Sequence, residues 1–95
     1  LLSIEKSVYV GLILNELIIN SLKHGFTLDT NSQKEINIQY KNIKNKKIEF
    51  TYNDNGIGIS TKEKPKLIHL LCRQIKTEYT IENKNGFNFK AVIKL

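Results

Sequence analysis

Residues 5–24 constrain the fold most, because they are apolar almost all the way round a helix. At about 100° per residue, the polar side chains of Glu16, Asn20 and Lys23 fall on one narrow stripe. With Ser3 available as an N-cap and Gly25 as a C-cap, a helix of about 20 residues is predicted. Such a helix must be largely buried, and a buried helix has no reason to desolvate three polar side chains unless they line a cavity. The stripe therefore indicates the wall of a cavity. The alternative is the exposed edge of an amphipathic helix joined by a salt bridge.

The next part of the chain has the alternation of a β-hairpin. Residues 35–40 alternate as a half-buried strand should, residues 42–46 supply a turn, and the return strand ends at Asn53. The side chains expected to face the core are Ile36, Ile38, Tyr40, Ile48, Phe50 and Tyr52. Residues 53–66 are expected to form a loop, because they contain two glycines and a proline, Gly56, Gly58 and Pro65.

The last third of the chain predicts a short helix and a second hairpin. The helix covers residues 66–75, and the hairpin strands cover 77–82 and 87–95 around a turn at 83–86. The apolar helix positions are Leu67, Leu70, Leu71 and Ile75, with Ile68 and Cys72 widening the buried face. In the turn, the Asn85-Gly86 pair favours positive φ. This order predicts an α+β fold, a two-layer sandwich with both helices on one face of a mixed sheet.

Composition limits the possible partners and compartments. The chain of 95 residues holds one domain, and its net charge of +6 comes from 14 lysines and a single arginine, Arg73, against 9 acids. Because phosphate and base recognition favours arginine, no nucleic-acid partner is expected. No apolar run approaches the roughly 18 residues that a membrane helix needs, so no membrane insertion is expected. With one cysteine, Cys72, and no methionine, we interpret the chain as a cytoplasmic segment of a longer protein.

A glycine-containing turn follows the predicted strand that ends at Asn53. Asp54 lies there beside Gly56 and Gly58. One use is a base pocket, in which the Asp54 carboxylate accepts a hydrogen bond from an exocyclic amine and the glycines admit a flat ring. The other is a plain turn, because Asp-Asn-Gly is common turn chemistry. A calcium loop of the EF-hand type is excluded, since its twelfth position falls on Lys62, where a glutamate is required.

Two segments together carry a family resemblance. Residues 15–26 are Asn-Glu-Leu-Ile-Ile-Asn-Ser-Leu-Lys-His-Gly-Phe, and residues 54–59 are Asp-Asn-Gly-Ile-Gly-Ile. They resemble the N box and the first glycine box of sensor histidine kinases, which belong to the Bergerat-fold ATPases with gyrase, heat-shock chaperones and mismatch-repair ATPases. The resemblance extends to residues 86–89 and the closing strand. It implies that residues 1–95 form a histidine kinase-like ATP-binding catalytic domain with a Bergerat-like fold.

The resemblance assigns the polar helix stripe to catalysis and to the cofactors ATP and Mg²⁺. Asn20 would hold Mg²⁺ through its side-chain oxygen, which suits a hard ion that keeps several waters. Lys23 would face the phosphates, and Glu16 would polarise the attacking group. His24 has either a role in the site or a helix-capping role near the negative end of the helix dipole.

The resemblance assigns the glycine turn to the base. Asp54 would bind the adenine amino group, Gly56 and Gly58 would give the ring its space, and Ile59 would complete the nucleotide-binding set. The family has a second glycine box and a long lid at this point, whereas residues 60–66 of this chain are expected to form a short loop. Its lysines, Lys62, Lys64 and Lys66, either contact phosphate or are solvated. A reduced lid with a weaker grip on phosphate is therefore expected. Phe87 stands where the family usually has a small hydroxyl residue.

The reaction implied by the resemblance is transfer of the ATP γ-phosphoryl group to a histidine. His24 lies in the N box and His69 in the second predicted helix, so the acceptor is expected on a separate, histidine-bearing dimerisation domain. The other implied partners are the receiver domain of a response regulator and a second copy of the full-length protein. The implied compartment is the cytoplasm, either for a wholly cytoplasmic protein or for the cytoplasmic part of a membrane-bound sensor. The alternative is a degenerate Bergerat-fold docking module with weak or no nucleotide binding.

Overall fold

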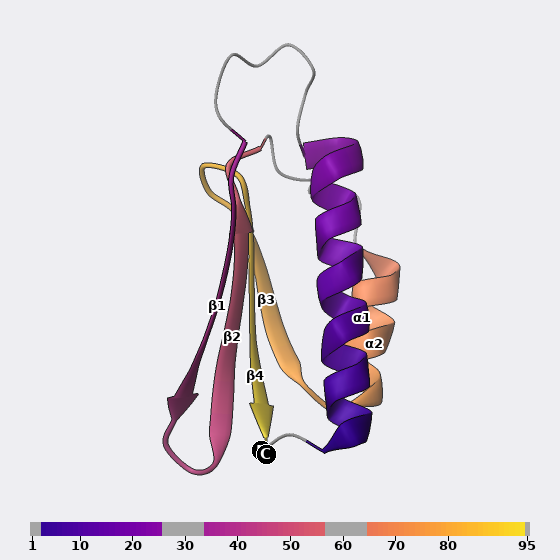
Figure 1. The fold of residues 1–95 in the computed structure, drawn as a ribbon, viewed down its shortest axis with the longest axis vertical. Coiled ribbons are helices and arrows are strands. Elements are labelled where there is room, and N and C mark those ends of the chain that lie inside the picture. The colour runs from indigo at the N-terminus through magenta and orange to yellow at the C-terminus, as the bar shows by residue number, and fades with distance from the viewer. Residues whose placement is uncertain (1–2, 26–33, 57–64, 95) are drawn as a thin grey trace.

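The structure is a computed structural model that describes residues 3–25, 34–56 and 65–94. Within these residues, two α-helices lie on one side of a four-stranded sheet (Figure 1). The elements are α1 (Ile4–Asn20), the π-helical turn η1 (Ser21–Gly25), β1 (Ile36–Ile43), β2 (Lys47–Asp54), α2 (Lys66–Gln74), β3 (Glu78–Asn83) and β4 (Phe87–Lys94). This confirms the predicted α+β class and the predicted order of helices and strands.

Helix α1 begins as the sequence predicts and ends differently. The Ser3 hydroxyl oxygen accepts a hydrogen bond from the Lys6 backbone N–H at 3.1 Å, which confirms the N-cap. The α-helix ends at Asn20, however, and the chain continues as the π-helix η1 through Gly25. The predicted C-cap at Gly25 is therefore wrong. A short π-helical stretch at the end of an α-helix is unusual and often marks a functional site.

The strands lie in the order β1-β2-β4-β3, and each neighbouring pair of described strands is antiparallel. The predicted mixed sheet is wrong for these strands, and the topology gives the reason. The crossover through α2 makes β3 run parallel to β2, but β4 folds back from β3 and inserts between the two. Each strand consequently meets only antiparallel neighbours, joined by a ladder in which Tyr52 pairs with Phe89.

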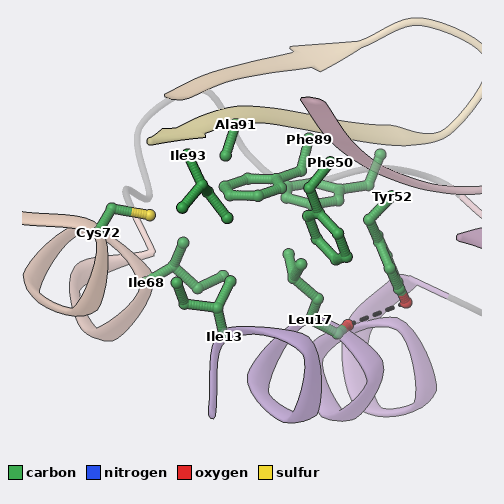
Figure 2. Close-up of a cluster of buried hydrophobic side chains, with 10 residues drawn as sticks. Ile13, Leu17, Phe50, Tyr52, Ile68, Cys72, Phe89, Ala91 and Ile93 are labelled. Carbon is green, nitrogen blue, oxygen red and sulfur yellow. Dashed lines mark hydrogen bonds between the residues drawn. The ribbon is translucent and has the colours of Figure 1, made fainter. Parts of the chain in front are cut away.

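The core fills the space between the helices and the inner face of the sheet (Figure 2). Its buried members are Ile13, Leu17, Phe50, Tyr52, Ile68, Cys72, Phe87, Phe89, Ala91 and Ile93. The inward position predicted for Phe50 and Tyr52 is confirmed. In α2, Ile68 and Cys72 form the centre of the buried face, whereas Leu67 and Leu70 are exposed, which corrects the predicted orientation of this helix.

Strand β1 differs most from its prediction. Ile38 and Tyr40 were expected to face the core, but 41% and 76% of their surfaces are exposed. β1 is an edge strand paired with β2, and from it only the partly buried Ile36 packs against the core. Alternation correctly predicts a strand here but does not show whether a helix covers it. The expected reduced lid and most of the predicted loop lie in residues 57–64, outside the described residues.

Neither described helix has both the length and the apolar character that crossing a bilayer requires.

The buried thiol of Cys72 gives the domain a pH dependence that can be measured. Burial raises the pKa of this thiol from its ordinary value of 9.0 to about 11. The neutral thiol is therefore favoured by folding, and this stabilisation is present below pH 9 and lost as the pH rises towards 11. We expect the free energy of unfolding in urea to fall over this range, and to fall less in Cys72→Ala. Parallel curves for the two proteins would contradict the assignment.

Candidate functional site

Asp54, at the end of β2, is a buried carboxylate held by donors from three separate parts of the chain. The Ser21 hydroxyl donates to Asp54 Oδ2 at 2.6 Å. The backbone N–H groups of Gly56 and Phe87 donate to Asp54 Oδ1 at 2.9 and 3.1 Å. A buried carboxylate needs such donors, since it loses its hydration. The carboxylate therefore joins the end of the first helix, the turn after β2 and the start of β4.

A second hydroxyl extends this network to the inside of α1. The Tyr52 hydroxyl lies 2.5 Å from Ser21 Oγ and 3.2 Å from the Leu17 carbonyl oxygen (Figure 2). Ser21 donates its single proton to Asp54, so Tyr52 is the donor towards Ser21. Burial raises the pKa of the Tyr52 hydroxyl above its ordinary value of 10.0, the hydrogen bond with Ser21 opposes the rise, and the Asp54 charge adds to it.

The turn between β3 and β4 approaches the Asp54 backbone closely. Gly86 has φ +123°, and a Cβ at this position would lie 2.0 Å from the Asp54 carbonyl oxygen. Only glycine fits both the space and the backbone angle. This approach brings the N–H of Phe87, the next residue, within hydrogen-bonding distance of Asp54 Oδ1.

The turn after β2 has the hydrogen bonds of a plain turn and also leaves an acceptor on Asp54. The bond from the Gly56 N–H to Asp54 Oδ1 is the side-chain turn expected of Asp-Asn-Gly. Asn55 holds the same turn to the start of β1, because the Glu35 N–H donates to Asn55 Oδ1 at 2.9 Å and the Asn55 N–H donates to the Glu35 carbonyl at 3.2 Å. Each carboxylate oxygen can accept two hydrogen bonds. From the described residues, Oδ1 accepts two and Oδ2 one, which leaves Oδ2 a second acceptor position.

The fold around this network is that of known histidine kinase structures. The histidine kinase domain from the Erythrobacter litoralis EL346 blue-light activated histidine kinase superposes with a TM-score of 0.82 at 21% identity, over 96% of this chain and 45% of that one. The Erythrobacter litoralis EL346 blue-light activated histidine kinase superposes with a TM-score of 0.84 at 18% identity, over 99% of this chain and 32% of that one. The chain thus spans less than half the length of either structure. A comparison with curated protein sequences gave no match.

The sequence decides the family. The family model of histidine kinase-, DNA gyrase B- and HSP90-like ATPases matches residues 5–92, nearly the whole chain. The chain belongs to this ATPase family. Both segments that carry the resemblance, residues 15–26 and 54–59, lie inside the match.

The structure brings two of the family segments together. Ser21 follows Asn20 directly, and its hydroxyl contacts Asp54, so the predicted magnesium residue and the predicted base residue are linked through one side chain. Glu16 and Asn20 are half-buried, whereas Lys23 is exposed. The predicted stripe assumes about 100° per residue, which holds to Asn20 but not for Lys23, because Lys23 lies in the π-helix.

Several predicted residues are not placed by the structure. Gly58, Ile59 and the lysines at 62 and 64 lie outside the described residues, as does the side chain of His24. His69 is described and exposed, and its Nδ1 lies 2.8 Å from the Tyr79 hydroxyl.

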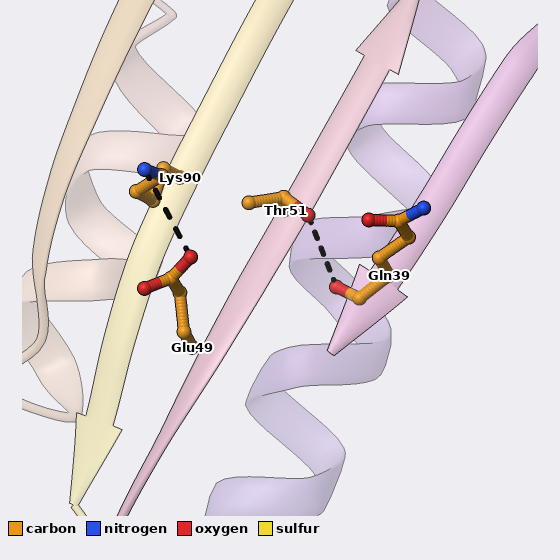
Figure 3. A network of polar contacts seen from close by, with 4 residues as sticks. All are labelled: Gln39, Glu49, Thr51 and Lys90. Carbon is orange, nitrogen blue, oxygen red and sulfur yellow. Dashed lines mark hydrogen bonds and ion pairs between the residues drawn. The ribbon is translucent and has the colours of Figure 1, made fainter. Parts of the chain in front are cut away.

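The uncovered face of the sheet is a separate polar surface. A hollow of about 340 Å³ there is lined by residues of β2, β3, β4 and the turn between the last two. The same face carries the ion pair between Lys90 and Glu49 at 3.8 Å and a hydrogen bond from the Thr51 hydroxyl to the Gln39 carbonyl at 3.3 Å (Figure 3). This hollow lies on the opposite side of the sheet from Ser21 and α1, so we do not assign it to the ATPase site.

Sequence reasoning missed Ser21, the Tyr52 hydroxyl, Gly86 and the Phe87 N–H as parts of the site. For Ser21 a signal existed. At about 100° per residue Ser21 falls between Leu14 and Leu17, so it is a hydroxyl in the apolar arc of the helix and needs a partner. For the other three, the local signal at Asn85-Gly86 predicts only a turn. Their roles at Asp54 depend on contacts between segments about 30 residues apart.

Proposed function

We propose that the chain is the ATP-binding catalytic domain of a two-component sensor histidine kinase, which presents the γ-phosphate of ATP to a histidine on a separate dimerisation domain. The family match supports the ATPase class, and the fold of the two kinase structures agrees with it. The observation that carries the proposal is the Asp54 carboxylate, buried and aligned by three donors beside the Asn20-Ser21 end of the first helix.

In this proposal Asp54 recognises the base. Its Oδ1 is engaged by the Gly56 and Phe87 N–H groups, so the second acceptor position on Oδ2 receives the 6-amino group of adenine. The proposal includes Gly56, Gly58 and Ile59 in the nucleotide-binding set, because glycine admits a flat ring close to the backbone. An acceptor at this point favours adenine over bases that present a carbonyl oxygen there, because two acceptors would face each other without a proton.

The magnesium and phosphate positions follow from the end of α1. Asn20 offers a neutral amide oxygen in a half-buried place, a ligand that suits Mg²⁺ when phosphates and waters complete its shell. When bound, Mg²⁺ neutralises charge on the phosphates. Lys23, on the exposed side of η1, contributes a further positive charge, and Glu16 polarises the attacking group.

The partners and the compartment in this proposal rest on the resemblance to sensor histidine kinases. The phosphorylated histidine lies on a separate dimerisation domain, and from there the phosphoryl group passes to the receiver domain of a response regulator. The full-length protein is a homodimer, and the domain acts in the cytoplasm.

Isothermal titration with Mg-ADP and Mg-ATP tests the proposal. We expect binding that Asp54→Ala abolishes, because this change removes the acceptor for the base amino group. The matched control is Glu82→Ala, which removes an exposed carboxylate on the uncovered face of the sheet and should leave the affinity unchanged. Circular dichroism shows whether each variant is folded. Absence of heat for the folded wild-type domain, with no displacement of a fluorescent ATP analogue, would exclude the catalytic function.

One observation favours a second candidate, the docking module without nucleotide. Donors from the chain itself satisfy Asp54 in three hydrogen bonds, so the fold does not depend on a ligand for this carboxylate. In that case a response regulator or a partner kinase domain would bind equally well to the wild type and to Asp54→Ala.

A further inference from the structure

Ser21 contacts Asp54, but the proposed function gives it no role in binding the metal or the base. Only 2% of its surface is exposed, and it lies at the junction between α1 and η1. Its hydroxyl donates to Asp54 Oδ2, the oxygen that retains an acceptor position, and accepts from the Tyr52 hydroxyl. Of the two acceptor positions on Oδ2, Ser21 therefore fills one, and the described residues leave the other open.

We propose that Ser21 is a positioning residue for base recognition: its hydroxyl holds Asp54 Oδ2 so that the second acceptor position meets the 6-amino group of the nucleotide. The inference rests on the proposed function and adds a determinant of base specificity to it.

The direction of each proton supports this role. Among the described residues, the Tyr52 hydroxyl has two acceptors within reach, the Leu17 carbonyl oxygen at 3.2 Å and Ser21 Oγ at 2.5 Å, and Ser21 is the nearer one. The Tyr52 proton therefore occupies a lone pair of Ser21 and keeps the Ser21 proton on Asp54. Consecutive hydroxyl donors polarise each other, so the pair also strengthens the bond to the carboxylate.

The geometry at Phe87 explains why this hydroxyl matters here. Phe87 stands where the resemblance leads one to expect a hydroxyl side chain, and it contributes only its backbone N–H, to Oδ1. The hydroxyl on Asp54 comes instead from Ser21, on the helix side and on the other carboxylate oxygen. The Gly56 and Phe87 bonds fix Oδ1, and Ser21 fixes the oxygen that meets the ligand.

Two nucleotides that differ only in the 6-amino group test the proposal. ADP carries this group, and purine riboside diphosphate lacks it. We expect the ratio of their affinities to fall about 10-fold in Ser21→Ala, because the amino group loses an oriented acceptor while the remaining contacts stay. Ser21→Thr keeps the hydroxyl and should restore the ratio. Ser7→Ala, which removes an exposed serine of the same helix, should leave the ratio unchanged.

A merely structural role would weaken both nucleotides equally, so an unchanged ratio in folded Ser21→Ala would overturn the inference. Should Ser21→Ala fail to fold, Tyr52→Phe gives the same test, with an expected fall of about 3-fold in the ratio, and an unchanged ratio there would also overturn it. The proposed function fails separately, when the wild-type domain binds neither nucleotide.

Discussion

Replacing Gly86 by alanine should destabilise the domain by about 3–5 kcal/mol and lower its thermal midpoint by about 15–30 °C. The added Cβ would lie 2.0 Å from the Asp54 carbonyl oxygen, 2.9 Å from its carbon and 3.1 Å from the Asn55 Cα, all of them backbone atoms. Backbone atoms cannot turn aside as a flexible side chain can, so the turn between β3 and β4 must move away from β2. The φ of +123° adds strain for any residue with a side chain.

The same displacement should reach the site, because the Phe87 N–H bond to Asp54 Oδ1 depends on the close approach of Gly86. The matched control is Gly11→Ala in α1, where an added Cβ meets nothing within 4 Å. In that exposed helix position alanine should stabilise by about 0.5–1 kcal/mol. Urea unfolding of the two variants beside the wild type measures both effects, and equal stabilities for Gly86→Ala and the wild type would contradict the geometry.

The sequence predicts the elements of this fold well because their signals are local. Alternation and turn chemistry give the two hairpins, and positive φ at Asn85 and Gly86 confirms the predicted turn. Periodicity does not show which strands are packed against a helix. Ile38 and Tyr40 alternate as core residues do, yet they lie on an edge strand where the core receives only Ile36.

For the candidate site, the sequence identifies the central carboxylate but not the groups that hold it. Asp54 stands out in the sequence because a recognisable motif surrounds it, and the structure places it in a buried network. Its partners Ser21 and Phe87 lie 33 residues away on either side in the sequence. Pairings of that kind depend on how the helix end and β4 meet β2, which no local pattern specifies.

The Asp54 network can reverse its direction without losing a hydrogen bond, and this makes asparagine an informative replacement. In Asp54→Asn the amide oxygen can take the place of Oδ1 and accept from Gly56 and Phe87. The amide nitrogen then donates to Ser21, Ser21 donates to Tyr52, and Tyr52 donates to the Leu17 carbonyl oxygen, 3.2 Å away. Because each group keeps a partner, the variant should remain folded.

In the proposed site, Asp54→Asn should weaken ADP binding about 100-fold or more and reverse the preference between bases. The second amide proton points to where Oδ2 accepted the 6-amino group, so two donors face each other and adenine is rejected. Inosine diphosphate presents a 6-oxo acceptor at that point and should bind the variant better than ADP does. Titration of both nucleotides against the wild type and the variant measures the change, with thermal unfolding as the control for folding. A folded variant that keeps the wild-type preference for ADP would show that Asp54 does not contact the base, because a contact at this carboxylate cannot tolerate exchange of an acceptor for a donor.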